Sequence, residues 1–200
     1  MEANIIQQYK RKAHFERGKY IPEQTLSIYR DTFPESPREW DNLSHIIFFR
    51  YRHNIGDKHN YNSDDFPSWN DLEEYLRENE GAYIIHPLSF YDGRNGIVIS
   101  IDESTERWDS ERDYGVIYVT KQTIEYEYGK LTPETEELVE KVLRGEVNDY
   151  NQYFRGDVYG FVIKNADGEI DYEEWGCYDD IDYIVKSTGF TEEDGAVNVY

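Results

Sequence analysis

The chain has 200 residues, of which 21 are Lys or Arg and 42 are Asp or Glu, so its formal net charge is −21 at pH 7. This excess of carboxylates excludes a protein that binds nucleic acid over most of its surface, because neutralising phosphates requires clustered Lys and Arg. It also argues against docking on an anionic membrane surface. Aromatic residues make up 16% of the chain, a content typical of a globular domain and not of a disordered acidic tail.

The charge is unevenly distributed along the chain. Residues 1–60 carry ten basic and eight acidic groups, a net charge of +2. Residues 61–200 carry the other 11 basic and 34 acidic groups, a net charge of −23. This asymmetry predicts an N-terminal basic helical or extended segment over residues 1–35, followed by an acidic α+β domain over residues 36–200.

Cysteine usage and hydropathy indicate a cytoplasmic setting. Cys177 is the only cysteine, so no internal disulfide can form and a reducing compartment is expected. No apolar stretch approaches the roughly 18 residues that a membrane-spanning helix requires. Residues 1–6 lack the pattern of a signal peptide. We therefore expect a cytoplasmic protein with no membrane partner.

In chain order, the first expected elements are a short helix over residues 4–17 and a strand over residues 44–53. The first stretch carries four basic residues, and the second is rich in Ile, Phe and Tyr. Ser68 is a good helix N-cap with Asp71 in the capping-box position, so a helix is expected from there to Gly81. Strands are then expected over three stretches: residues 83–86, 96–101 and 114–120.

Two helices are expected next, a short one over residues 121–128 and a longer one that begins at Thr132-Pro133. An N-cap residue followed by Pro at the first helical position is a typical helix start. Apolar residues then recur at helical spacing and form one stripe. They are Val139, Leu143, Val147, Tyr150 and Phe154.

A β-hairpin and a last short helix complete the expected elements. The hairpin joins residues 157–164 to residues 169–176, and the helix spans residues 179–187. The sum predicts a single α+β domain with an antiparallel or mixed β-sheet and three to four helices.

Two stretches contain residue types that ligate metals, but neither has a complete pattern. If Gly168 is placed at position 6 of a calcium-binding loop, position 1 falls on Ile163, which offers no side-chain oxygen. An ordinary hairpin turn is the better interpretation. His53, Asp57 and His59 lie in one polar loop, but nothing nearby completes a zinc site, so a surface loop is the better interpretation. We therefore expect no metal and no cofactor.

No catalytic residues are expected. The chain has no Gly-rich phosphate loop, no nucleophile elbow and no paired-His metalloprotease motif. Cys177 is a nucleophile by type, but its neighbours Glu173, Glu174, Asp179 and Asp180 should raise the pKa of the thiol, which disfavours the reactive thiolate. A structural role is expected for three histidines that are isolated in the sequence: His14, His45 and His86.

Arginines on the strand expected over residues 44–53 are candidate ligands for an anion. Arg50 and Arg52 alternate with aromatic residues, so their side chains should share one face. Together with Arg38 they are suited to hold a phosphate or carboxylate group. The alternative is that these arginines pair with the protein's own abundant acidic residues.

The densest acidic stretch is residues 165–185, which contains eight carboxylates and no Lys or Arg. The eight candidate partner-binding residues are Asp167, Glu169, Asp171, Glu173, Glu174, Asp179, Asp180 and Asp182. Glu169, Asp171 and Glu173 alternate along an expected strand, so they should project from one face at intervals of about 6.8 Å. That interval is similar to the spacing of phosphates along a nucleic-acid strand. The alternative is a solvated acidic surface that serves solubility.

Five motifs are spread over residues 30–180. They are SPREWDNL at 36–43, YRHNIGD at 51–57, RWDS at 107–110, YNQYFRGDVYG at 150–160 and WGCY at 175–178. In these motifs the chain resembles an uncharacterised family of small acidic proteins from bacteriophages and mobile elements. The resemblance implies a phage-against-host setting and no particular chemistry.

Three classes of function are compatible with these observations. The first is a phage-encoded anti-defence inhibitor that binds a host nucleic-acid-binding protein or nuclease, such as a restriction enzyme or CRISPR effector, by acidic mimicry of nucleic acid. It would not bind nucleic acid itself. The second is a protein that binds or sequesters a nucleotide-like small molecule in a pocket lined by Arg and Tyr. The third is a scaffold or assembly protein. The sequence is also compatible with a homo-oligomer, and it leaves open whether the basic N-terminal segment packs on the acidic body.

Overall fold

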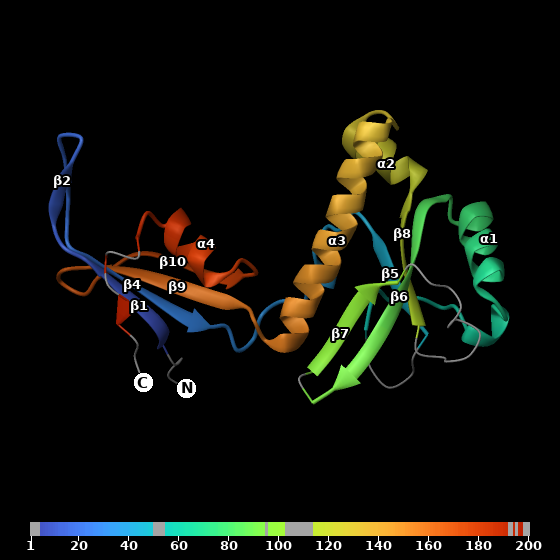
Figure 1. The fold of residues 1–200 in the computed structure, drawn as a ribbon, viewed down its shortest axis with the longest axis horizontal. Helices are drawn as coiled ribbons and strands as arrows, with labels where there is room; N and C mark the ends of the chain where they lie inside the picture. The colour runs from blue at the N-terminus through green and yellow to red at the C-terminus, as the bar shows by residue number, and fades with distance from the viewer. Residues whose placement is uncertain are drawn as a thin grey trace. The chain divides into compact units, whose positions relative to one another are not determined.

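The computed structural model of the protein describes residues 5–49, 55–94, 96–102, 114–191, 194 and 196–197. It has the predicted α+β class, with four α-helices and antiparallel sheets among the described residues (Figure 1). The chain forms two compact units, a terminal unit of residues 1–35 and 156–200 and a central unit of residues 36–155. The predicted boundary after residue 35 coincides with a transition between units, but residues 156–200 belong with the N-terminal segment.

The terminal unit is built on a five-stranded antiparallel sheet. Its strands are β1 (Ile5–Arg11), β4 (Gln24–Arg30), β9 (Tyr159–Asn165), β10 (Ile170–Cys177) and β11 (Ala196–Val197), in the order β10-β9-β4-β1-β11. Between β1 and β4 in the chain, β2 (His14–Glu16) and β3 (Lys19–Ile21) form a separate hairpin. Helix α4 (Ile181–Ser187) covers one face of the sheet, where its Ile184 and Val185 join a core cluster with Leu26, Ile28 and Phe161.

The helix expected over residues 4–17 is wrong, because this stretch forms strands β1 and β2. β1 pairs with β4 along its length, and its Tyr9 is only 4% exposed within the same core cluster as Leu26. Local preference for helix or strand is weak in so short a stretch, and tertiary pairing overrides it. The expected hairpin is confirmed as β9 and β10, and the expected last helix is confirmed as α4.

The central unit is built on a four-stranded antiparallel sheet with a helix on each face. Its strands are β5 (His45–Phe48), β6 (Ala82–Gly93), β7 (Gly96–Ile101) and β8 (Tyr114–Thr120), in the order β5-β8-β6-β7. Its helices are α1 (Trp69–Asn79), α2 (Lys121–Tyr128) and α3 (Pro133–Arg155), with short 3-10 turns η1 (Pro37–Glu39) and η2 (Ser63–Asp65). Although α3 has 23 residues, neither it nor another described helix is long and apolar enough to cross a membrane.

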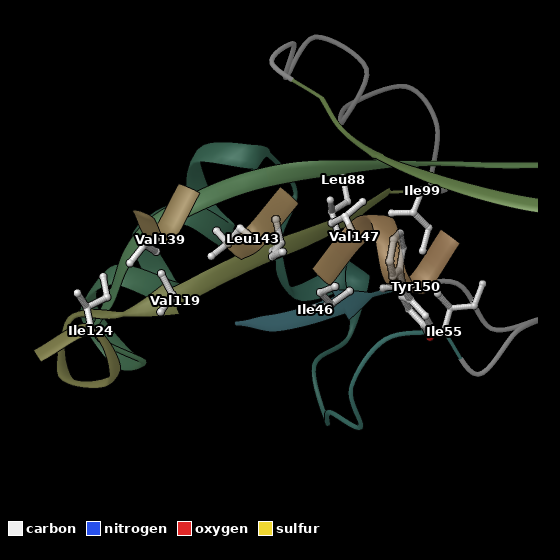
Figure 2. Close-up of a cluster of buried hydrophobic side chains, with 12 residues drawn as sticks. Ile46, Ile55, Leu88, Ile99, Val119, Ile124, Val139, Leu143, Val147 and Tyr150 are labelled. Atoms are coloured by element: carbon white, nitrogen blue, oxygen red, sulfur yellow. The ribbon is translucent and has the colours of Figure 1, made fainter. Parts of the chain in front are cut away.

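The alternation of side chains along β8 produces two cores. Ile117 and Val119 belong to the cluster that contains α3, whereas Val116 and Tyr118 belong to the cluster that contains α1. The predicted apolar stripe of α3 is confirmed, because four of its five members are buried in the first cluster (Figure 2). They are Val139, Leu143, Val147 and Tyr150, and Phe154 packs against the cluster while partly buried.

The other elements expected in the central unit are also present. The strand expected over residues 44–53 is confirmed over His45–Phe48, while residues 50–54 lie outside the described residues. α1 begins after Ser68, which forms the predicted capping box with Asp71. β7, β8 and α2 occupy the expected stretches, and Gly129 ends α2. β6 includes the expected residues 83–86 but continues to Gly93, because its second half pairs with β7.

Leu143→Ala tests the assignment of the buried face of α3. Leu143 is fully buried, so its truncation should leave a cavity and lower the free energy of unfolding by about 2–5 kcal/mol. Leu138 on the same helix is 49% exposed, and Leu138→Ala should change stability by less than about 0.5 kcal/mol. Urea denaturation measures both variants, and equal losses would contradict the assignment.

Candidate functional site

The eight predicted partner-binding carboxylates are all exposed in the terminal unit. They form three groups: Asp167 and Glu169 at the β9–β10 turn, Asp171, Glu173 and Glu174 on β10, and Asp179, Asp180 and Asp182 at the start of α4. β10 is an edge strand of the five-stranded sheet. The carboxylates therefore follow the rim of the sheet from the turn to the helix.

The prediction that Glu169, Asp171 and Glu173 share one face is wrong, because a β-bulge interrupts the alternation. The register between β10 and β9 shifts at Asp171, so that two residues of β10 oppose one residue of β9. Glu173 pairs with Val162, on the face of the sheet turned away from α4. Asp171 instead reaches the α4 side, where its Oδ2 accepts a hydrogen bond of 2.8 Å from the side-chain amide of Gln24.

Four of the eight carboxylates accept hydrogen bonds within the unit: Glu169, Asp171, Glu174 and Asp180. Their donors are the Asn165 side-chain amide, the Gln24 side-chain amide, the Tyr172 hydroxyl and the Tyr183 backbone amide, at 3.2, 2.8, 2.8 and 2.7 Å. The bond to Asp180 caps the N-terminus of α4. None of these donors is a cation, so the bonds position the carboxylates without cancelling their charge.

No described Lys, Arg or His forms an ion pair with any of the eight carboxylates. Four of them, Asp167, Glu173, Asp179 and Asp182, also accept no hydrogen bond from another described residue. Residues 156–200 contain two basic and 12 acidic residues, a net charge of −10. The eight carboxylates therefore form a concentrated negative surface that no described cation pairs with.

Strand pairing settles how the basic N-terminal segment relates to this acidic surface. β1 pairs with β4, and β4 pairs with β9, so the two segments share one sheet. Arg11 on β1 donates to Oε1 of Gln24, which in turn donates to Asp171. Arg11 also donates to the Gly189 carbonyl and lies 4.4 Å from the centroid of the Phe190 ring. The segment thus packs on the acidic part of the chain, where Arg30 pairs with Asp157 at 3.4 Å. None of its described cations pairs with the eight carboxylates.

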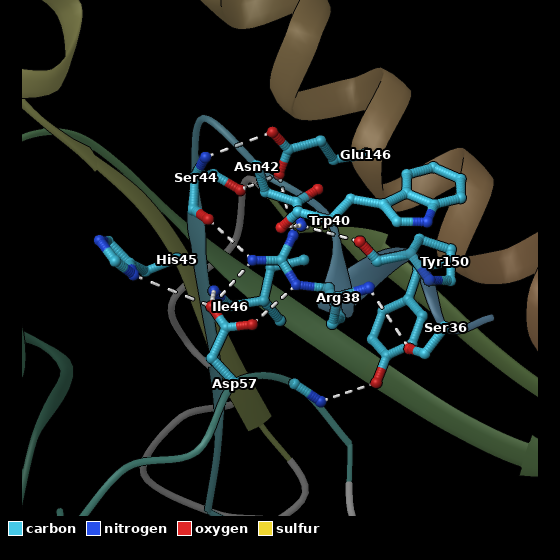
Figure 3. Close-up of polar contacts among 12 residues, drawn as sticks. Ser36, Arg38, Trp40, Asn42, Ser44, His45, Ile46, Asp57, Glu146 and Tyr150 are labelled. Atoms are coloured by element: carbon cyan, nitrogen blue, oxygen red, sulfur yellow. Dashed lines mark hydrogen bonds and ion pairs between the residues drawn. The ribbon is translucent and has the colours of Figure 1, made fainter.

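In the central unit, Arg38 lies in a buried polar cluster (Figure 3). Its side chain is 6% exposed. Nε and Nη2 each donate to one carboxylate oxygen of Asp57 at 2.8 Å, and Nη1 donates to Oε2 of Glu146 at 2.9 Å. Nη2 also donates to the Ser44 carbonyl at 2.7 Å. Four of the five guanidinium N–H groups are therefore engaged by the protein itself.

The electrostatics of the cluster hold Arg38 in its charged form. Burial by itself lowers the pKa of Arg38, but the hydrogen bonds and charge of Asp57, followed by those of Glu146, outweigh burial and raise it. The two carboxylates are satisfied in turn by backbone donors: Glu146 accepts from the amides of Leu43 and Ser44, and Asp57 accepts from the amide of Ile46.

Arg38 therefore takes the second of its two expected roles and pairs with the protein's own acids. A guanidinium with four donors engaged is poorly placed to hold a phosphate as well. Arg50 and Arg52, the other two candidate ligands, lie outside the described residues.

Cys177 has the properties expected of an unreactive thiol. It is buried in the core of the terminal unit. Burial raises the pKa of its thiol to about 11, and the charges of Glu174, Asp179 and Asp31 add to the effect. The predicted direction of this shift is confirmed, because burial and acidic neighbours both disfavour the thiolate.

The β9–β10 turn has the geometry of an ordinary hairpin connection. Oδ1 of Asn165 accepts hydrogen bonds from the amides of Asp167 and Glu169, so a calcium-loop ligand position is already occupied. Ile163 is buried in the core. Within the described part of the chain, no group of three or more His, Cys, Asp and Glu residues is arranged to hold a metal ion.

Sequence reasoning did not identify a cavity of about 280 Å³ beside the Arg38 cluster. It is lined by His45, Ile47, Asp57, Lys58, His59, Asn60, Tyr61 and Tyr118. The loop that carries Asp57 and His59 was predictable as polar. The approach of His45 and Tyr118 depends on the pairing of β5 with β8, which no local pattern indicates.

Comparison of the chain with models of protein families, with curated proteins and with solved structures finds no match. The assignment of a function therefore depends on the residues and their geometry.

Arg38→Ala tests whether the buried cluster stabilises the central unit. Removing the guanidinium leaves Asp57 and Glu146 close together without a cation, so the free energy of unfolding should fall by about 3–5 kcal/mol. Arg77→Ala is the control, because Arg77 pairs with Glu73 on the surface of α1 with its side chain 46% exposed. This variant should lose less than about 1 kcal/mol in the same urea titration. Comparable losses would show that the Arg38 cluster contributes no more than a surface pair.

Thiol labelling tests the environment of Cys177. With its pKa near 11, the thiolate fraction at pH 8 is about two orders of magnitude below that of an ordinary cysteine, so the native protein should react correspondingly slowly with iodoacetamide. The rate should rise as the pH increases towards 11. Protein unfolded in urea is the control and should react at the rate of a free thiol. Rapid labelling of the native protein at pH 8 would contradict the buried environment.

Proposed function

We propose that the protein is an anti-defence inhibitor that binds the nucleic-acid-binding surface of a host nuclease, such as a restriction enzyme or CRISPR effector. The observation that carries this proposal is that eight exposed carboxylates on β10, its turn and the start of α4 form no ion pair with a described cation. The nucleic-acid-binding surface of a nuclease carries Lys and Arg side chains that bind phosphates. Those side chains would provide the ion-pair partners that the eight carboxylates lack.

The position of the carboxylates on an edge strand suits this function. The bulge at Asp171 directs Asp171 and Glu173 to opposite faces of the sheet, so charge is presented on both sides of the rim. Proteins that bind single-stranded nucleic acid hold the strand in a positively charged groove. The two walls of such a groove would contact the charges on the two faces of the β10 edge. Complementary charge of this kind accelerates encounter and fixes orientation.

The setting of the proposal comes from the resemblance of residues 30–180 to small acidic proteins of bacteriophages and mobile elements. An inhibitor of this kind acts in the cytoplasm of the host cell and needs no catalytic residue, cofactor or direct contact with nucleic acid. The competing interpretation is that the acidic rim only maintains solubility and prevents edge-to-edge association of β10.

A quadruple substitution separates the two interpretations. D167N, E173Q, D179N and D182N remove four charges that have no hydrogen-bonding role among the described residues, so the fold should be retained. If the rim replaces phosphates, the concentration needed to inhibit a susceptible nuclease should rise by about tenfold or more. Inhibition by the natural protein should also weaken steeply as salt rises from about 50 to 200 mM. A panel of purified restriction enzymes and CRISPR effectors provides the assay.

A matched control has the same change in charge at a different surface. E74Q, E78Q, E127Q and E137Q are exposed positions of the central unit, and together they should alter inhibition by less than about twofold. Equal effects of the two quadruple variants, or inhibition that is insensitive to salt, would indicate that the rim is not the binding surface.

A further inference from the structure

The cavity of about 280 Å³ in the central unit is bounded by two pairs of rings in contact, one tilted and one stacked. His45 of β5 lies against Tyr118 of β8, with ring centroids 5.0 Å apart and 31° between the ring planes. In the loop that follows β5, His59 and Tyr61 lie 5.6 Å apart at 21°. The cavity therefore presents aromatic faces from the sheet and from the loop.

The loop rings are held in place by hydrogen bonds. Nε2 of His59 lies 2.9 Å from the Phe48 carbonyl, and its Nδ1 accepts from the amide of Tyr61 at 3.2 Å. These contacts assign Nε2 as the donor and Nδ1 as the acceptor. The hydroxyl of Tyr61 donates to Glu80 at 2.7 Å. A wall fixed in this way binds a ring without first losing side-chain freedom.

The polar groups of the cavity are suited to the edge of a heterocycle. Tyr118 is 4% exposed, and burial, together with the charges of Glu80 and Asp57, raises its pKa to about 12. Its hydroxyl is therefore neutral, and it can donate or accept a hydrogen bond. Lys58 and Asn60 are exposed at the cavity. Among the described residues, neither side chain has a hydrogen-bond or ion-pair partner.

The metal-ligating groups of the cavity are already engaged within the protein. They therefore offer no site for a metal ion, and Asp57 offers no free carboxylate oxygen to a ligand. Both oxygens of Asp57 are engaged by Arg38, and one also accepts from the Ile46 amide. Both ring nitrogens of His59 are likewise engaged. Among the described lining residues, what remains is aromatic surface, neutral hydrogen-bonding groups and the ammonium group of Lys58.

We propose that this cavity binds a nucleoside monophosphate, with the base stacked against His45 and the rings of the loop, and the phosphate near Lys58. Aromatic side chains stack on bases of any sequence, and a lysine ammonium binds phosphate as a point charge. The volume is close to the lower end of the range for small-molecule sites, which suits one base with part of its sugar. The site uses none of the carboxylates of β10 and α4, so it is independent of the proposed inhibitor surface.

Calorimetric titration of the full chain with AMP, GMP, CMP and UMP, their nucleosides and ribose 5-phosphate tests the proposal. At least one nucleotide should bind, its nucleoside should bind more weakly by about threefold to tenfold, and ribose 5-phosphate should bind least. His45→Ala, at an edge strand position with its side chain 53% exposed, should weaken nucleotide binding by about tenfold or more. Lys58→Ala should abolish the difference between nucleotide and nucleoside.

Matched controls keep the test specific to the cavity. Tyr126 is 85% exposed on α2, and Tyr126→Ala removes an aromatic ring elsewhere on the central unit. Lys130→Ala removes an exposed cation away from the cavity lining. Both should bind nucleotide as the natural protein does, and thermal unfolding verifies that all four variants are folded. No binding by any nucleotide up to about 1 mM, binding unaffected by His45→Ala, or equal affinity for ribose 5-phosphate would each overturn the proposal.

Discussion

The positively charged side chain of Arg38 is only 6% exposed, and it forms ion pairs with the carboxylates of Asp57 and Glu146. Taking three charges out of water costs several kcal/mol per ion, and only good geometry with additional hydrogen bonds offsets that cost. The geometry is good here, because one carboxylate is bound by two guanidinium nitrogens and both carboxylates accept backbone amides. Residues from η1, the loop after β5 and the middle of α3 are thereby tied to one point.

The position of β5 depends on that cluster. β5 has only four residues and lies at the edge of its sheet, so β8 is its one neighbouring strand. The amides just before and within β5 donate to Glu146 and Asp57, which adds anchors that strand pairing does not supply. Gly56 completes the arrangement, because its φ is +81° and a Cβ there would lie 2.6 Å from the Ile46 carbonyl oxygen. Its amide donates to the Tyr150 hydroxyl of α3 at 2.8 Å.

The carboxylates at these two places thus differ in their physical setting. Those of Asp57 and Glu146 are drawn into the central unit, where an arginine and backbone amides balance them. Those of β10 and α4 remain in water, and where they accept hydrogen bonds the donors are uncharged. The first class stabilises the fold, and its carboxylate oxygens are already engaged within the central unit. The second class stabilises little, and for that reason retains its charge for binding a cationic surface.

Features that depend on residues close together in the sequence were predictable, whereas features that depend on the pairing of distant segments were not. The helix stripe through Leu143, the capping box of Ser68 and the β9–β10 turn depend on neighbours in the sequence, and they were predictable from spacing and residue type. Strand β1 was predicted as a helix, because only its pairing with β4 buries Tyr9. The prediction that Glu169, Asp171 and Glu173 share one face was wrong for a related reason. A β-bulge arises from the register of two strands and not from the alternation of side chains along one strand.

The sequence by itself determined the composition of the molecule and its local elements: the acidic excess, the dense carboxylates after residue 165, the single cysteine and the amphipathic long helix. Only the tertiary structure decided which charges cancel. It placed Arg38 against its own acids, joined the basic N-terminal strands to the acidic C-terminal ones, and brought His45 to Tyr118 at the wall of a cavity. Charge and residue type are properties of single positions, whereas burial, strand register and the pairing of distant groups exist only after the chain has folded.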